Sequence, residues 1–229
     1  MEIVKKIFEP WSTHCKSPNR IDSCVLNIPG RHQSGGMMSN LYSTIVRDRT
    51  IVVGITPEDY EWYPLPNGAN DQQNSLDGVR DAFKSINEVI SLISIKFGIP
   101  RKRMVLAGFS AGGVMAIEMA AYTHEPFAGI IVHAGAILEP NDLPTCQWPD
   151  MPIHLFHQED DDVFKWEERY MPMKQSLIKQ GYQTKSIERK TGKHSILWEH
   201  HSHIKNILSK CLPEIGNHTS HVNISTTIA

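Results

Sequence analysis

The chain has 229 residues, which is long enough to bury one sizeable hydrophobic core. Hydrophobic residues make up 40% of the chain and charged residues 21%, a balance that excludes wholesale disorder. The formal net charge of -2 argues against a surface built mainly to bind nucleic acid or anionic lipid. No apolar run approaches the roughly 20 residues of a membrane-spanning helix, so we expect no stable membrane insertion.

The N-terminal segment and the cysteines favour a cytoplasmic protein. Residues 1–20 contain a lysine pair without an apolar stretch behind it, so they do not match a secretory signal. Cys15, Cys24, Cys146 and Cys211 lie far apart and lack CxxC spacing. We therefore expect four reduced thiols, as is usual in a cytoplasmic compartment.

Apolar segments of strand length recur along the chain, separated by segments of helix length. Most of them are continuously apolar rather than alternating, which is typical of parallel strands covered by helices on both faces. One weaker candidate is more polar and suits the edge of a sheet. The predicted strands span residues 22–28, 50–55, 103–109, 128–133 and 152–157, with the weaker strand at 183–189 and an early edge strand near 3–8.

The best-defined helix lies between the second and third of these strands. Apolar residues spaced by three or four positions form one stripe from Val79 to Phe97. Ser75 or a nearby polar residue is a candidate N-cap, and Gly98 followed by Pro100 predicts where the helix ends. Further helices are predicted at residues 39–47, 111–122, 165–180 and 194–210.

The alternation of strands and helices predicts the α/β class. We expect an open, mostly parallel sheet flanked by helices on both faces, with right-handed crossovers. Residues 1–212 are predicted to form a single domain, and the polar residues 213–229 a disordered C-terminal tail. Two proline-bearing loops, 56–74 and 138–151, connect predicted elements, and long loops of this kind often carry function.

One sequence motif points to a specific chemistry. Gly108, Ser110 and Gly112 match GxSxG, a pattern that chance alone gives in roughly one chain in ten of this length. The context is more specific, because a buried strand precedes the motif and Ala111 opens a helix rich in small residues. That arrangement is typical of a nucleophile elbow, where glycines permit a sharp turn and the helix N-terminus favours developing negative charge. The alternative is a glycine-rich turn without chemistry.

A serine nucleophile needs a base that is itself oriented by a carboxylate. In this kind of fold the acid and then the base follow the serine along the chain. Residues 159–162, with the sequence EDDD, directly follow a predicted strand and fit the acid position, although a solvated turn explains at least two of them. His194 follows a glycine-bearing turn after the weak strand and is the candidate base.

The other histidines offer less favoured interpretations. His32 lies beside a candidate oxyanion loop and is the main rival base. His200, His201 and His203 fall within one predicted helix, but carboxylate and thiolate partners for a metal site are not suitably spaced. We therefore expect no metal and no cofactor. His157 ends a predicted strand and is interpreted as structural.

Four segments of the sequence carry a family resemblance. They are WYP at 62–64, GIPRKRMVLAGFSAGG at 98–113, HQEDDDV at 157–163 and GKHSI at 192–196. Together they resemble the phospholipase/carboxylesterase family of α/β-hydrolases, small serine esterases that include acyl-protein thioesterases. The resemblance covers roughly Asp22 to Lys210.

This resemblance implies a role for particular residues. It makes Ser110 the nucleophile, Asp161 the acid and His194 the base of a catalytic triad. Three departures from the family pattern bear on substrate range more than on mechanism. They are Ala111 in place of a common Gln, Gln158 in place of the Gly of HGxxD, and an additional Lys193 between the Gly and the His of the base motif.

The resemblance also implies an oxyanion hole made of backbone N–H groups. Ala111 supplies one donor, since replacing Gln by Ala leaves the backbone unchanged. The family's HGxG-type segment corresponds here to Pro29–His32, and Pro29 has no N–H to donate. The second donor is therefore Gly30 or Arg31, and the alignment favours Arg31.

The sequence thus predicts a serine hydrolase that cleaves carboxylic esters or thioesters through an acyl-enzyme intermediate. The expected partner is a small-molecule or lipid acyl ester or thioester, and not a nucleic acid. Trp62 and Tyr63 are predicted walls of the substrate pocket, with covering of the core as an equally weighted alternative. A peptidase or amidase on the same fold and a non-catalytic binding module are the alternative functions. A dienelactone-type hydrolase is disfavoured because its nucleophile is cysteine, whereas position 110 holds serine.

Overall fold

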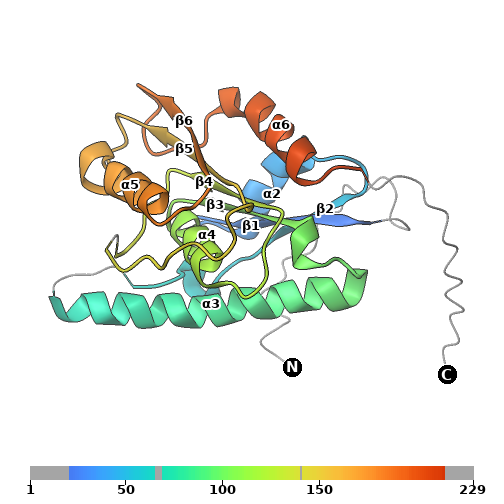
Figure 1. Ribbon diagram of the computed structural model, residues 1–229, viewed down its shortest axis with the longest axis horizontal. Coiled ribbons are helices and arrows are strands. Elements are labelled where there is room, and N and C mark those ends of the chain that lie inside the picture. The colour runs from blue at the N-terminus through green and yellow to red at the C-terminus, as the bar shows by residue number, and fades with distance from the viewer. Residues whose placement is uncertain (1–20, 65–68, 140, 215–229) are drawn as a thin grey trace, which may run out of the picture.

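The computed structural model describes residues 21–64, 69–139 and 141–214, and it shows one parallel sheet with helices on both faces (Figure 1). The sheet has six strands in the order β2-β1-β3-β4-β5-β6, and every neighbouring pair is parallel. This confirms the predicted architecture. The strands are β1 Ser23–Ile28, β2 Thr50–Gly54, β3 Met104–Phe109, β4 Gly129–His133, β5 Ile153–Gln158 and β6 Thr184–Arg189.

The strands differ in how deeply they are buried. β1, β3 and β4 lie inside the sheet, and all of their residues are buried. Successive side chains point to opposite faces, so Leu26 joins the core on one side and Val25 the core on the other. β6 pairs only with β5 and is mostly half-buried, as its polar sequence predicts for an edge strand.

Two layers of helices cover the sheet. The helices α3 and α4 lie against one face, and α2 and α6 lie against the other (Figure 1). Short helical turns at Glu58–Tyr60, Arg101–Arg103, Trp166–Tyr170 and Trp198–His200 connect the longer elements. The helices are α2 Gly35–Ser43, α3 Ala69–Phe97, α4 Ala111–Tyr122, α5 Met171–Lys179 and α6 His201–Cys211.

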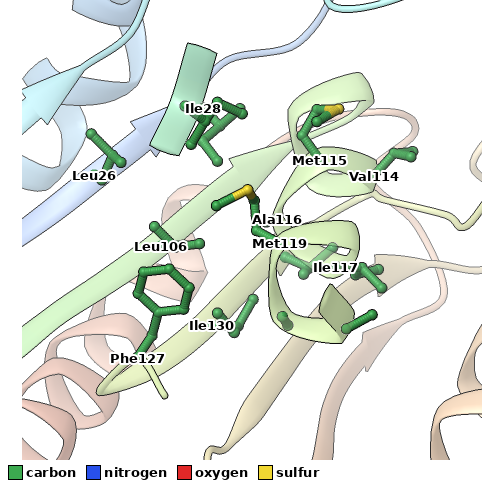
Figure 2. Packing of buried hydrophobic residues seen from close by; sticks show 14 of the residues in the cluster. Leu26, Ile28, Leu106, Val114, Met115, Ala116, Ile117, Met119, Phe127 and Ile130 are labelled. Carbon is green, nitrogen blue, oxygen red and sulfur yellow. The ribbon is translucent and has the colours of Figure 1, made fainter. Parts of the chain in front are cut away.

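The larger of the two cores packs α4 against the centre of the sheet (Figure 2). Val114, Ile117 and Met119 of α4 are fully buried, together with Leu106 of β3 and Ile130 of β4. Full burial of an aliphatic side chain of this size contributes roughly 1.5–3 kcal/mol. Since α4 begins directly after Ser110, this packing fixes the start of the helix relative to the strand ends.

A second, smaller core on the opposite face contains neutral histidines. The Nε2 atom of His133 lies 2.9 Å from the hydroxyl of Tyr42. The ring of His133 stacks on Phe156 with centroids 4.8 Å apart, and Phe156 also contacts His200 at 4.7 Å. Burial lowers the pKa of His133 to about 3 and the pKa of His200 to about 4, so both rings are neutral at physiological pH.

Several predicted boundaries are wrong. α3 begins at Ala69, so Ser75 lies inside the helix and does not cap it. The sequence missed this first part of α3 because residues 69–75, ANDQQNS, are polar and carry no apolar period. α2 begins four residues earlier than its predicted start, at Gly35. The predicted end of α3 is confirmed, since Gly98 follows Phe97 with φ of 66°.

The predicted helix at 194–210 also begins too early. Regular helix starts at His201, after a single turn at Trp198–His200, and residues 190–197 form a loop. Within that loop the hydroxyl of Ser195 donates to the Gly192 carbonyl at 2.6 Å, a local contact that competes with helix formation. The predicted strand near 3–8 and residues 215–229 of the predicted tail lie outside the described residues.

Candidate active site

Ser110 occupies a sharp turn between β3 and α4. Its backbone has φ of 54° and ψ of −121°, a conformation that costs a non-glycine residue free energy and requires support from its surroundings. Part of that support is a hydrogen bond from the Ser110 N–H to the His133 carbonyl, at 3.0 Å. The turn directs the serine side chain away from the buried strand and toward the loops at the carboxyl ends of the strands.

The two glycines of the motif allow backbone segments to approach closely. A Cβ atom at Gly108 would overlap the carbonyl of Gly112, and one at Gly112 would overlap the carbonyls of Ile28 and Pro29. Only glycine fits at these two positions without a shift of the backbone. The close contact also brings the end of β1, and the loop that follows it, directly against the start of α4.

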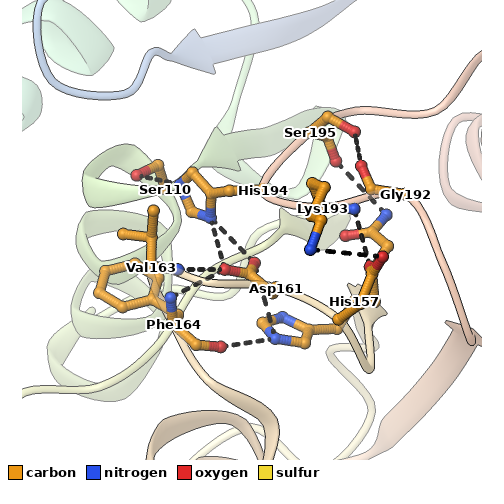
Figure 3. Close-up of polar contacts among 11 residues, drawn as sticks. Ser110, His157, Asp161, Val163, Phe164, Gly192, Lys193, His194 and Ser195 are labelled. Carbon is orange, nitrogen blue, oxygen red and sulfur yellow. Dashed lines mark hydrogen bonds and ion pairs between the residues drawn. The ribbon is translucent and has the colours of Figure 1, made fainter.

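His194 joins the serine to a carboxylate (Figure 3). Its Nε2 lies 2.8 Å from the Oγ of Ser110, and its Nδ1 lies 2.9 Å and 3.1 Å from the two carboxylate oxygens of Asp161. These three residues come from the ends of three different strands, β3, β5 and β6. The structure therefore brings together the three residues that the sequence assigned to a triad, in the expected order along the chain.

The Asp161 side chain is fully buried and its charge is stabilised by several donors. Besides the contact with His194, its Oδ1 accepts hydrogen bonds from the backbone N–H groups of Val163 and Phe164, both at 2.9 Å. Burial alone would raise the pKa of Asp161, but these hydrogen bonds outweigh burial and hold it below its ordinary value. The carboxylate is therefore ionised at neutral pH and able to pair with an imidazolium.

Two phenylalanine rings confine the imidazole of His194. The ring of Phe109 lies 5.1 Å from it and the edge-on ring of Phe164 lies 5.6 Å from it, measured between centroids. Only 14% of the His194 side chain is exposed. Partial exclusion of water strengthens the two polar contacts of the imidazole.

His157 supports the turn that carries Asp161. Its side chain is buried and stacks on Tyr170, with centroids 4.2 Å apart and the planes 10° from parallel. Its Nε2 lies 2.8 Å from the Phe164 carbonyl, so this nitrogen carries the proton and donates it. Burial lowers the pKa of His157 despite the nearby Asp161 carboxylate, and the ring stays neutral. The structural interpretation of His157 agrees with these contacts.

The loop after β1 lies beside the serine. A Cβ atom at Gly30 would lie 3.1 Å from the Cβ of Ser110. The Gly30 N–H already donates to the side-chain oxygen of Gln33 at 3.2 Å. The Arg31 guanidinium is held by Glu61 at 3.0 Å and by the Tyr63 carbonyl at 2.7 Å.

Ala111 is the first residue of α4, so its N–H precedes the first hydrogen bond within the helix. The carbonyl of Ser110 accepts instead from Gly113 and Val114, at 2.9 Å and 3.1 Å. The N–H of Ala111 therefore lies at the positive end of the helix, one residue after Ser110. This is the position from which a backbone donor can stabilise an oxyanion.

Trp62 and Tyr63 are both buried, with 6% and 4% of each residue exposed. The Trp62 Nε1 donates to the Pro29 carbonyl at 2.7 Å, and the Tyr63 carbonyl accepts from Arg31. Both side chains belong to the larger core. These contacts favour the alternative in which the two aromatics cover the core and support the loop after β1.

The other histidines that the sequence offered, His32, His200 and His201, have contacts other than the serine. His32 is 74% exposed, and its Nε2 lies 4.0 Å from Glu61. His200 is buried in the smaller core, and the Nδ1 of His201 contacts the Trp198 carbonyl. In the described part of the chain, no group of three or more His, Cys, Asp or Glu residues is arranged to hold a metal ion. Cys24, Cys146 and Cys211 are free thiols, and Cys15 lies outside the described residues.

The parallel sheet, its helices and the serine turn after β3 define the α/β-hydrolase fold. The chain belongs to the phospholipase/carboxylesterase family. The sequence profile of this family matches residues 51–212, which are more than half of the chain. This confirms the family resemblance found in the sequence. A relative from Dictyostelium discoideum, named acyl-protein thioesterase 1 homolog 2, is 32% identical to this chain over 102 residues. That alignment covers 42% of this chain and 45% of the relative, so it spans less than half of the relative's length.

Solved structures share the fold at low sequence identity. The esterase PE8 superposes with a TM-score of 0.76 at 21% identity, over 90% of this chain and 99% of that one. A phospholipase/carboxylesterase from Dyadobacter fermentans gives 0.68 at 19% identity, over 83% and 90% of the two chains. The Bacillus cereus carboxylesterase gives 0.70 at 14% identity, over 90% and 93%. Identities this low establish the fold alone.

No helix in the described residues is both long and apolar enough to span a membrane.

Proposed function

We propose that this protein is a serine hydrolase that cleaves carboxylic esters or thioesters through an acyl-enzyme intermediate. The observation that carries the proposal is the 2.8 Å separation between the His194 Nε2 and the Ser110 Oγ, with Asp161 on the opposite nitrogen. A serine hydroxyl becomes a useful nucleophile when a base at this distance accepts its proton. Family membership supports ester substrates.

In the first half of the reaction, Ser110 Oγ attacks the acyl carbonyl while His194 Nε2 takes the hydroxyl proton. The imidazolium that forms is stabilised by Asp161, whose carboxylate accepts the Nδ1–H and fixes the tautomer of the ring. His194 then returns the proton to the departing alcohol or thiol, and the acyl group stays on Ser110 as an ester. In the second half, His194 takes a proton from water as the water oxygen attacks the acyl carbonyl. The imidazolium then returns that proton to the Ser110 Oγ as the free acid leaves.

The negative oxygen of each tetrahedral intermediate needs donors fixed in advance. Ala111 and Arg31 are proposed to supply them through their backbone N–H groups. The start of α4 supports the first, since its N–H has no partner within the helix. The second is supported by the contacts that hold the Arg31 side chain and by the bond that occupies the Gly30 N–H.

The substrate class is narrowed by the relatives and not by the site. The Dictyostelium relative is named an acyl-protein thioesterase, which supports acyl thioesters as one substrate class to test. A peptidase or amidase would use the same three residues, and only activity on amide substrates distinguishes it. A non-catalytic module would be expected to lack the short contact between serine and imidazole.

The experiment is a panel of nitrophenyl esters of increasing chain length and of acyl thioesters, tested on the wild type and Ser110→Ala. Ser110→Ala should lose nearly all activity, while Ser91→Ala, an exposed serine on α3, serves as the matched control. A Ser110→Ala variant with more than about a tenth of wild-type kcat/KM, a loss below ~1.4 kcal/mol, would contradict the proposal. A fluorophosphonate probe should label the wild type at Ser110, and EDTA should leave the rate unchanged.

A further inference from the structure

The loop at residues 190–197, here called the base loop, contains an unfavourable backbone conformation next to His194. Lys193 has φ of 55°, in the left-handed region that a residue with a Cβ atom rarely adopts. Such a conformation costs roughly 1–2 kcal/mol and persists where surrounding contacts hold it. Lys193 is also the residue that separates the glycine from the histidine in this chain's base motif (Figure 3).

Asp160 provides a contact that holds this conformation. Its Oδ1 accepts a hydrogen bond from the backbone N–H of Lys193 at 2.8 Å. The Lys193 ammonium lies 3.9 Å from its other oxygen, and the Asp160 side chain is 29% exposed. Because Asp160 directly precedes Asp161, one short turn binds both the imidazole of His194 and the backbone immediately before it.

A weaker contact lies on the other side of His194. The side-chain amide of Gln158 donates to the Ser195 carbonyl at 3.4 Å. The Gln158 carbonyl in turn accepts the Asp161 N–H at 3.2 Å, so Gln158 belongs to the same turn. The family has glycine at this position, and a glycine has no side chain to form this contact. The turn therefore contacts the base loop before and after the histidine.

The two acidic neighbours of Asp160 and Asp161 differ from them. Neither the Glu159 nor the Asp162 carboxylate forms a hydrogen bond or ion pair with any described residue, and the Asp162 residue is exposed. The acidic run of this chain thus divides into two carboxylates that bind the base loop and two that face solvent. Asp160 differs from these neighbours in its contacts with Lys193, since one oxygen accepts the backbone N–H and the other lies 3.9 Å from the ammonium.

We propose that Asp160 is a positioning residue that fixes the backbone of His194 through the Lys193 N–H, and so sets the approach of the imidazole to Ser110. The inference rests on the proposed serine hydrolase function. Asp160 touches neither the reacting atoms nor the imidazole, so its effect on the reaction passes entirely through the base loop. What it contributes is an oxygen at a fixed place, and its charge is not required.

The test compares three replacements of Asp160 with an Asp162→Ala control. Asp160→Ala removes the acceptor, so kcat for the best ester of the panel should fall by on the order of 10²-fold while KM stays within about twofold. Asp160→Asn keeps an oxygen in place and should restore kcat to within about tenfold of wild type. Asp160→Glu keeps the charge but displaces the oxygen by one methylene, so it should be slower than Asp160→Asn. Asp162→Ala should match the wild type.

Hydrogen exchange of the Lys193 amide provides a second readout that does not depend on activity. Exchange should be faster in Asp160→Ala and Asp160→Glu than in the wild type, Asp160→Asn or Asp162→Ala. A normal melting temperature in each variant establishes that the fold is intact, and the Asn–Glu comparison decides the question if Asp160→Ala does not fold.

Two results would overturn the proposal. One is wild-type kcat in Asp160→Ala, and the other is a more active Asp160→Glu than Asp160→Asn, which would assign the effect to charge. An inactive wild type that no fluorophosphonate labels would refute the proposed function instead. In that case unchanged exchange of the Lys193 amide in Asp160→Ala would still overturn the role of Asp160, and faster exchange would support it.

Discussion

The serine turn and the two loops that complete the site are held by different forces. Around Ser110 the backbone is fixed by close packing, since Gly112 contacts the end of β1 with no room for a Cβ atom. Around His194 the Lys193 backbone and the His194 imidazole are held by polar contacts, from Asp160 and Asp161 respectively. The first region should therefore be most sensitive to added volume, whereas the second should be most sensitive to the loss of an acceptor.

Among the acidic residues that follow β5, loss of the Asp161 carboxylate should have the largest effect on activity. Asp161→Asn leaves an imidazole with the wrong tautomer available, and we expect kcat to fall by on the order of 10²–10⁴. The lower end of that range allows for partial substitution by a neighbouring carboxylate. Steady-state kinetics on the best ester substrate, with Asp162→Asn as control, measures the effect. An Asp162→Asn variant that is more than about tenfold slower than wild type would mean that the acid is assigned to the wrong residue.

Gly112→Ala tests the packed region around Ser110. The added methyl group would overlap the carbonyls of Ile28 and Pro29, so we expect a loss of folding free energy of about 3 kcal/mol or more. Urea unfolding of the purified variant measures it. Gly98→Ala is the matched control, because no heavy atom lies within 4 Å of a Cβ atom there and only its φ of 66° opposes the change. Equal stability of the two variants would show that the contact with β1 is not tight.

Acid should weaken the core through its neutral histidines before it affects the packed turn. The folded pKa of His133, about 3, lies below the ordinary value, so the unfolded chain binds the proton first as pH falls. Stability is therefore complete above about pH 6.5 and decreases as pH falls toward 3, by on the order of 2 kcal/mol at pH 5 for His133 alone. His200, with a pKa of about 4, adds to the loss in the same direction. Urea unfolding at pH 7 and pH 5 measures the difference, which His200→Phe should reduce.

Trp62→Phe should have a smaller effect than Gly112→Ala, because it removes one hydrogen bond and one ring of the indole without forcing the backbone to move. The Pro29 carbonyl loses its donor at 2.7 Å, which should cost about 1–3 kcal/mol of folding free energy. If kcat falls in a variant that is still folded at the assay temperature, the loop after β1 depends on this hydrogen bond in the way that the loop around His194 depends on its polar contacts. Kinetics and thermal unfolding of the same preparation separate the two effects.

The sequence predicts the packed region better than the polar one. The strands β1 to β5, the more polar edge strand at 183–189 and the start of α4 at Ala111 follow from residue patterns that act over a few residues. By contrast, only the family resemblance distinguishes Asp161 from the other three carboxylates in the run, because residue type and local sequence do not separate them. The contact between Asp160 and Lys193 joins residues 33 apart, and no local pattern reports it. Likewise, the hydrogen bond from the Gly30 N–H to Gln33 depends on the orientation of the Gln33 side chain, and no sequence motif indicates that orientation.

The placement of the base at the end of β6 has a consequence for heat inactivation. β6 has one neighbouring strand and is mostly half-buried, whereas β3, which leads to the serine, is buried between two strands. Edge elements with few buried contacts open at lower free energy than the interior of a domain. The base should therefore detach from the serine in a partial opening that leaves the centre of the sheet intact. Activity would then be lost reversibly at temperatures where the interior strands are still folded.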